Sequence, residues 1–188
     1  MDHQVAPHGT LEQRLRAVED KLAILNLVAS HPLGADTGAA SHVQAMWAPD
    51  GVIDLANGKE AAGHVAIAAM VAAPGHQAAI AGGLAHFAGL PHIELTGDTA
   101  VVTSYLQILT PQPDGAVEAV EVPNHGASRG FRVHRVGVNR WELQRDSRDG
   151  TGWKIKRRTL RPLDGSEPAR ALLRQALDGS TRPAAGSA

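Results

Sequence analysis

The sequence predicts an α+β fold, with helices in the first part of the chain and a run of strands in the second. Residues 10–73 space their apolar positions three and four apart, whereas residues 84–160 contain alternating apolar and polar segments joined by turns. This order of elements is typical of an α+β protein with a mostly antiparallel sheet. A length of 188 residues with 43% hydrophobic content suits one domain with one core.

The first element is predicted to be an amphipathic helix that begins after Thr10. Thr10 and Gln13 match a capping box, and Pro32 and Gly34 disturb the far end of the pattern, which places Asp36 on the last turn or just beyond it. Apolar residues follow the cap at alternating steps of four and three, namely Leu11, Leu15, Val18, Leu22, Leu25 and Ala29.

Four shorter segments are expected between the first helix and the run of strands in the second half of the chain. Residues 39–47 predict a second helix, residues 50–55 a turn and brief strand, and residues 60–73 an alanine-rich helix ended by Pro74-Gly75. Residues 75–83 are expected to form a mobile loop.

The second half predicts antiparallel strands. Gly97-Asp98 supplies a hairpin turn between strands at 92–95 and 100–109, and Pro91 indicates a bulge or an edge position. Residues 111–130 predict an extended hairpin loop. Two long strands then follow, at 131–144 and 153–160, and a terminal helix at 168–177.

The expected organisation is a disordered N-terminus (1–9), one domain (10–165), a C-terminal helix (166–178) and a disordered tail (179–188). A net charge of −1 gives no field that would attract nucleic acid, and no long apolar run or signal peptide is visible. A cytoplasmic protein without membrane or nucleic-acid partners is therefore expected. The absence of cysteine excludes disulfides and thiolate sites, and it is compatible with a reducing compartment.

Neither a metal nor an organic cofactor is expected. The ten histidines include no H-E-x-x-H pattern or close His-x-His cluster. No glycine-rich nucleotide-binding motif and no serine nucleophile elbow is present.

Asp36 and His86 are the principal candidate site residues. Asp36 ends the stretch ILNLVASHPLGAD, and His86 lies at the start of HFAGLPHIELTGDTAVV, which predicts a strand, a turn and a strand. If the fold brings the two together, the carboxylate can accept the imidazole Nδ1–H and leave Nε2 as a base. The alternative is structural, with Asp36 capping a helix and a neighbouring carbonyl satisfying His86.

Residues 10–162 resemble the nuclear-transport-factor-2-like superfamily, and within it the SnoaL-like branch of polyketide cyclases and small dehydratases such as scytalone dehydratase. The resemblance rests on four segments in order, namely LGAD, MWAPDGVIDL, HFAGLPHIELTGDTAVV and RWELQRDSRDGTGWKIKRR. It implies a cone-shaped, strongly curved, mixed sheet wrapped around the N-terminal helices and enclosing an apolar pocket. It also implies a homodimer or higher homo-oligomer formed through the outer face of the sheet.

The resemblance extends to individual site residues. Asp36 and His86 match the carboxylate and the catalytic histidine of bile-acid 7α-dehydratase, hexachlorocyclohexane dehydrochlorinase and similar relatives. His31 lies where those relatives carry Lys or Tyr, and Arg158 is similar to a cavity-facing arginine of the dehydrochlorinase that could stabilise an oxyanion. The alternatives are a surface histidine beside Pro32 and a solvated basic strand end.

Further residues are expected to line the pocket or contact a substrate. Tyr105 is the only tyrosine, and strand alternation places it opposite Leu106, so it either reaches the cavity or faces solvent. The other candidates are His134 and Asn139 as contacts, with Trp47 and Phe87 as wall or core.

These features favour a cofactor-independent lyase or isomerase, of dehydratase or cyclase type, acting on a small hydrophobic cyclic or polyketide-like substrate. The competing hypothesis is a ligand-binding or assembly subunit, which the long 111–130 loop favours. Geometry separates the two. A carboxylate in contact with the imidazole, with Nε2 facing an enclosed void, would favour catalysis, whereas a filled cone would favour assembly.

Overall fold

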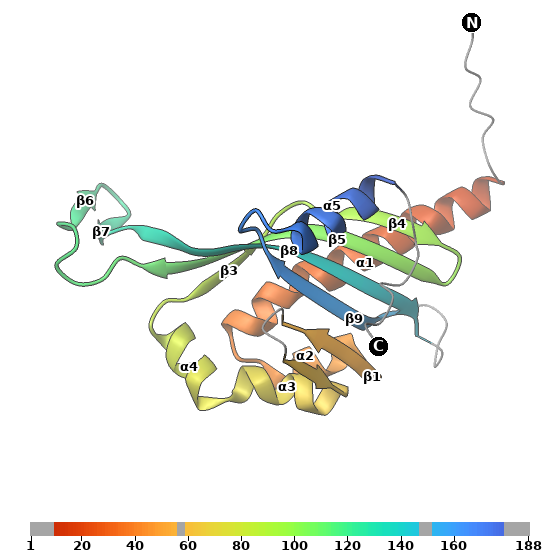
Figure 1. Cartoon of the computed structure of the whole chain (residues 1–188), viewed down its shortest axis with the longest axis horizontal. Coiled ribbons are helices and arrows are strands. Elements are labelled where there is room, and N and C mark those ends of the chain that lie inside the picture. Colours follow the sequence, from red (N-terminus) through yellow and green to blue (C-terminus); the bar gives the residue numbers. More distant parts are fainter. Residues whose placement is uncertain (1–9, 56–58, 147–151, 179–188) are drawn as a thin grey trace, which may run out of the picture.

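A computed structural model describes residues 10–55, 59–146 and 152–178 of the chain. It contains one curved sheet with helices on both faces and a small two-stranded sheet at the end of a long arm (Figure 1). The helices are α1 (Leu11–Asp36), α2 (Ala40–Met46), α3 (His64–Ala72), α4 (Pro74–Ala81) and α5 (Glu167–Leu177). The strands are β1 (Trp47–Asp54), β2 (Glu60–Ala62), β3 (Ala85–Ala88), β4 (His92–Thr96), β5 (Thr99–Pro111), β6 (Val120–Val122), β7 (Gly126–Ser128), β8 (Phe131–Arg145) and β9 (Trp153–Pro162).

The main sheet has the order β2-β1-β9-β8-β5-β3, and β4 pairs with the other half of β5. Only the β1–β9 pair is parallel, so the sheet is mixed but mostly antiparallel. Pro91 lies between β3 and β4, where the chain leaves one half of β5 and joins the other. Pro91 itself belongs to neither strand, and in this connection between two edge segments its missing amide hydrogen removes no hydrogen bond of the sheet.

The strand register divides the sheet into an inner and an outer face. Val102, Trp141, Arg158 and Ile53 are cross-strand partners in one row on the inner face. That face packs against α1, α2 and α3, and it builds the main core. The smaller helix α5 covers part of the outer face, where Val138 packs against it. The predicted α+β architecture with a curved sheet around the N-terminal helices is confirmed.

The first helix begins as predicted but buries a different stripe from the one that identified it. Thr10 and Gln13 form the capping box, and the helix continues through Pro32 to Asp36. The buried residues are Asp20, Ile24, Val28, His31, Gly34 and Ala35. The stripe from Leu11 to Leu25 is exposed on the opposite side. The sequence pattern therefore located the helix without showing which of its two apolar faces enters the core.

Two local predictions are wrong. The expected loop at 75–83 is mostly helix α4, because Pro74 at its first turn and the following alanines favour a helix. The predicted helix at 60–73 begins only at His64, since residues 60–62 pair with β1 as β2. The extended hairpin loop predicted at 111–130 is confirmed, because it connects the paired strands β5 and β8, and it contains the short paired strands β6 and β7. The disorder predicted for 1–9 and 179–188 concerns residues outside the described part of the chain.

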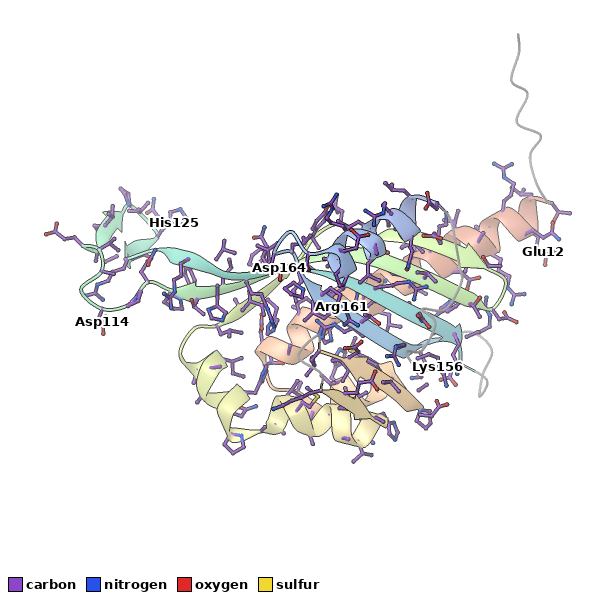
Figure 2. The ribbon with its side chains drawn as sticks, in the orientation of Figure 1. Glu12, Asp114, His125, Lys156, Arg161 and Asp164 are labelled. Carbon is purple, nitrogen blue, oxygen red and sulfur yellow. The ribbon has the colours of Figure 1, made fainter. Side chains whose placement is uncertain are left out.

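A long arm extends from one end of the sheet. It consists of the far ends of β5 and β8 with β6 and β7 beyond them (Figure 1). Figure 2 shows Asp114 and His125 near its tip, far from the helices that cover the inner face. The arm therefore contributes little to the core.

A buried ion pair fixes α1 to the strands. Asp20 accepts two hydrogen bonds from Arg145, each 2.8 Å long, and a third of 3.1 Å from Trp153 Nε1. Arg145 lies over the Trp153 ring and also pairs with Asp98. The hydrogen bond from Arg145, followed by that from Trp153, holds the pKa of Asp20 below its usual value despite its burial.

Replacing Asp20 with alanine is expected to lower the free energy of unfolding by about 3 kcal/mol, because it removes the carboxylate that accepts two hydrogen bonds from the partly buried Arg145 guanidinium. Urea denaturation would measure the change. Asp114→Ala, at a carboxylate on the exposed arm, is the control and should change stability by less than about 0.5 kcal/mol. Equal effects of the two substitutions would contradict a structural role for the Asp20 network.

No single helix in the described ranges is long and apolar enough to cross a membrane. Helices α3 and α4 reach that length and composition only as a pair, and they meet at a bend of 48°.

Candidate functional site

Asp36 and His86 are in direct contact. Asp36 Oδ1 lies 2.5 Å from His86 Nδ1, and Asp36 Oδ2 accepts a hydrogen bond of 2.9 Å from the His86 backbone N–H. The side chains are 28% and 13% exposed respectively, so the pair lies at the border between core and solvent. Because one carboxylate accepts hydrogen bonds from both the backbone and the ring of His86, it fixes the position and the ring orientation of this histidine.

Each partner is placed by the end or the edge of an element. Asp36 is the last residue of α1, and the chain turns at Gly38 with φ of +63° before α2 begins. This positive φ favours glycine at the turn, and a Cβ atom there would also displace the side-chain amide of Gln77 on α4. His86 lies on β3 and pairs with Ile108 of β5, and this register places His86 on the inner face.

The remaining ring nitrogen of His86 is available. Since Asp36 accepts from Nδ1, the proton of the neutral ring is on Nδ1 and Nε2 carries the lone pair. No described residue hydrogen-bonds to Nε2, and Nε2 is not among the fully enclosed unpaired polar atoms. The pair therefore presents an oriented, accessible base.

His76 is a neighbour that sequence reasoning missed. Its Nε2 donates to the carbonyl oxygen of Ala35 over 2.7 Å, and its ring stacks on that of His86 with 6.3 Å between centroids. The hydrogen bond joins α4 to the last turn of α1, next to Asp36. Because residues 75–83 were expected to be a loop, no pattern placed His76 at the site.

A second cluster of polar side chains lies on the inner face around Arg158. Its Nε donates to Asn139 Oδ1 over 3.0 Å, and its Nη1 lies 2.9 Å from His31 Nε2. The guanidinium also lies 4.7 Å from the Trp141 ring centroid. These contacts hold a buried cation between neutral groups.

Arg158 has no carboxylate partner among the described residues, and its own partners are neutral. Arg140 on β8 is equally buried, but it pairs with Glu142. Burial lowers the pKa of Arg158 to about 10, so the side chain still carries its charge at neutral pH. An uncompensated cation of this kind can stabilise negative charge that develops nearby.

The Arg158 contact fixes the state of His31. A guanidinium has no acceptor, so His31 Nε2 must accept and the ring proton must be on Nδ1, which is buried without a partner. Burial, followed by electrostatic repulsion from Arg158 and then from the nearby imidazoles of His86 and His76, holds the pKa of His31 well below its ordinary value of 6.5. His31 is therefore a neutral hydrogen-bonding group.

His31 makes stability depend on pH in a defined direction. Because its folded pKa is depressed, the unfolded chain binds the additional proton and acid destabilises the fold as pH falls through about 6.5. Between pH 7.5 and 5.5, wild type should lose about 1 kcal/mol more unfolding free energy than His31→Gln, which removes the titrating group. Denaturant melts of both proteins at the two pH values measure the difference. Parallel losses would show that His31 is not the source.

The other sequence candidates divide between the two faces of the sheet. Asn139 is buried and contacts Arg158, and Trp47 is buried in the core. Tyr105 and Phe87 lie on the outer face and are about half exposed or more, and His134 is exposed on the arm. The structure does not bring these last three residues to the Asp36–His86 pair, because alternation turns Phe87 on β3 and Tyr105 on β5 to the outer face and His134 is exposed on β8.

Five hollows of about 280 to 590 Å³ open elsewhere on the described residues. None of them is lined by Asp36, His86, His31 or Arg158. The first part of the geometric criterion, contact between the carboxylate and the imidazole, is met, whereas none of these five hollows supplies the enclosed void that forms its second part. Across the three described ranges, no three His, Asp or Glu side chains are grouped as metal ligands.

Comparison with protein-family models assigns most of the chain. Residues 16–159 match the model of the SnoaL-like domain. The chain belongs to the SnoaL-like family. The match includes all four residues of the two clusters, Asp36, His86, His31 and Arg158. No curated protein sequence matches this SnoaL-like chain.

Solved structures agree with the family assignment. An NTF2-like protein with a cystatin-like fold from Novosphingobium aromaticivorans is 33% identical, with a TM-score of 0.75, over 89% of this SnoaL-like chain and 99% of that one. A protein from the same organism, described as a candidate scytalone dehydratase, is 18% identical with a TM-score of 0.58, over 79% and 87% of the two chains. A candidate dehydratase of the NTF2-like family from Streptomyces avermitilis is 15% identical with a TM-score of 0.56, over 79% and 99%. The last two likenesses show the fold alone.

Proposed function

We propose that this SnoaL-like protein is a cofactor-independent lyase or isomerase, of dehydratase or cyclase type, that removes a proton from carbon in a small hydrophobic cyclic or polyketide-like substrate. The observation that carries the proposal is the 2.5 Å contact between Asp36 Oδ1 and His86 Nδ1, which leaves Nε2 without a described partner. A positioned base of this kind is what proton abstraction requires.

Each residue has a separate role in the proposed reaction. His86 Nε2 accepts the proton from carbon, and Asp36 stabilises the imidazolium that forms. The electrons of the C–H bond form an enolate or the new double bond. In an elimination, the proton then combines with the departing hydroxide to give water, whereas in an isomerisation it returns to another carbon.

Arg158 and His31 are proposed to stabilise the negative charge that develops on the substrate oxygen. The guanidinium has five N–H donors, of which Asn139 and His31 accept one each, so three remain for a ligand. Its charge has no described counter-ion, and electrostatic stabilisation is strongest where water is excluded. The neutral Nδ1–H of His31 would add a donor beside it if a ligand displaced the surrounding packing.

The proposal is tested by incubating the purified protein in D₂O with hydroxylated or unsaturated polyketides and steroids. We expect enzyme-dependent deuterium uptake at carbon, with loss of water for hydroxylated compounds, detected by mass spectrometry. Absence of both exchange and turnover across the set, in protein whose folding is verified by circular dichroism, would count against the enzyme.

The competing function is an assembly or ligand-binding subunit with the same fold. The exposed arm favours it, because Val117, Val120, Val122, Phe131 and Val133 are all solvent-accessible apolar side chains on the arm. The oriented Asp36–His86 pair favours the enzyme, since an assembly surface gives no reason to leave an imidazole nitrogen unpaired near the core. Exchange activity that depends on His86 would decide between them.

A further inference from the structure

The uncovered face of α1 has the features of a helix-pairing seam. Leu11, Leu15, Val18, Leu22 and Leu25 are 36 to 78% exposed, and Ala29 continues the same row. They lie about 140° around the helix axis from the buried stripe centred on Ile24, as 100° per residue requires. A helix that buries one apolar face and exposes a second, about 27 Å long, has an unsatisfied surface.

The spacing of this row specifies what it can bind. The steps are four, three, four, three and four, which match the spacing of the a and d positions of a coiled coil over about two and a half heptads. In heptad notation Leu15, Leu22 and Ala29 occupy a positions, and Leu11, Val18 and Leu25 occupy d positions.

We propose that α1 forms a parallel two-stranded coiled coil with α1 of a second copy of the chain. The flanking charges select the partner and its direction. The e positions carry Glu12, Glu19 and Asn26, and the g positions include Arg14 and Lys21. In a parallel pair each g residue meets the e residue five positions further along the partner helix, so Arg14 faces Glu19 and Lys21 faces Asn26.

An antiparallel pair would be disfavoured by the same charges. It would place e opposite e and g opposite g, bringing Glu12 and Glu19 together on one side and Arg14 and Lys21 on the other. A pair of helices suffices because Val28, at the remaining g position, is already buried in the core of its own subunit and is not available to a third helix. The seam is thus confined to one stripe.

The geometry of the subunit leaves room for this pairing. The seam and the core-facing stripe lie on nearly opposite sides of α1, so a second helix would sit away from the sheet. The N-terminal part of α1 also extends beyond the sheet in Figure 1. The two subunits would therefore lie on opposite sides of the helix pair. With α1 already folded, association incurs no cost of helix formation.

The experiment measures the association state of the full-length protein by sedimentation velocity at 1 to about 100 μM, the range in which a small interface with a micromolar dissociation constant should assemble. Wild type should dimerise. Leu15→Glu with Leu22→Glu should raise the dissociation constant more than about 100-fold, because it places four charges in the seam. The replaced leucines are exposed, so the monomer should fold normally, which circular dichroism verifies.

Phe87→Glu with Tyr105→Glu is the matched control on the outer face of the sheet, where both side chains are exposed. It should leave the dimer intact. A wild-type protein that stays monomeric at about 100 μM overturns the proposal. So does a dimer that the outer-face control abolishes and the α1 variant preserves, since that result would place the interface on the sheet.

Direction is tested by two further measurements. Arg14→Glu alone and Glu19→Arg alone should each weaken the dimer, and the double exchange should restore it. The chain contains no cysteine, so Leu22→Cys introduces a single thiol at an a position. Oxidation should link two copies in a parallel pair, where a faces a, while Val65→Cys on exposed α3 should not link. Failure of the Leu22→Cys link in a dimeric protein would overturn the parallel arrangement.

Discussion

His86→Ala is expected to lower turnover about 10²- to 10⁴-fold, with little change in stability. The substrate for this measurement is the compound that shows deuterium uptake in D₂O. The imidazole is proposed to accept the proton from carbon, and loss of a positioned general base typically costs this much. Its ring is linked to Asp36 and stacks near His76, so its removal leaves the fold-determining contacts of the core in place. Steady-state kcat and kcat/KM measure the effect.

His125→Ala is the matched control for this substitution. His125 lies near the tip of the arm and is exposed, as Figure 2 shows, so the same chemical change there should leave turnover unaltered. If His86→Ala and His125→Ala turn over substrate at the wild-type rate, the proposed mechanism is wrong even though the family assignment stands.

Asp36→Asn is expected to lower kcat about 10- to 10³-fold, because the amide retains the shape but cannot balance the positive charge of the imidazolium. The amide can also present N–H to Nδ1, which would move the ring proton to Nε2 and remove the lone pair from the base. Asp114→Asn, at a carboxylate that is 95% exposed on the arm, is the control and should be neutral.

A double-variant cycle tests whether Asp36 acts through His86. If Asp36 serves only to orient and stabilise the imidazole, Asp36→Asn should cost almost nothing in a protein that already carries His86→Ala, because residues that act as a unit are strongly non-additive. A further loss of tenfold or more in the double variant would show that Asp36 contributes to the reaction by another route.

The Asp36–His86 contact and the Arg158 cluster lie on the same inner face of the sheet but depend on different elements. Asp36 and His86 meet where α1 ends against the edge strand β3, whereas Arg158 is held by β8 and α1. His31 is coupled electrostatically to both, since Arg158, His86 and His76 all lower its pKa. Under the proposed function, a substrate would place its acidic carbon near His86 and its oxygen toward Arg158.

The sequence by itself determined the elements whose signals are local. The capping box at Thr10 located the start of α1, and Gly97-Asp98 defined the β4–β5 hairpin, because hydrogen bonds and turn geometry within a few residues decide such features. Strand alternation placed Tyr105 opposite Leu106 but left open whether Tyr105 reaches the cavity, and only the packed sheet shows that it lies on the outer face. The identification of Asp36 and His86 as a pair came from the resemblance, since no local pattern can show that residues 50 positions apart will meet.

Only the tertiary structure decided which surface each element buries. The heptad row from Leu11 identified α1, yet the sheet packs against the stripe of Ile24 and Val28, because a helix with two apolar faces can bury either one. His76 reached the site because α4 is a helix that lies against the end of α1. The neutral state of His31 likewise depends on a guanidinium contributed from 127 residues away, and burial beside that group is a property of packing that sequence spacing does not encode.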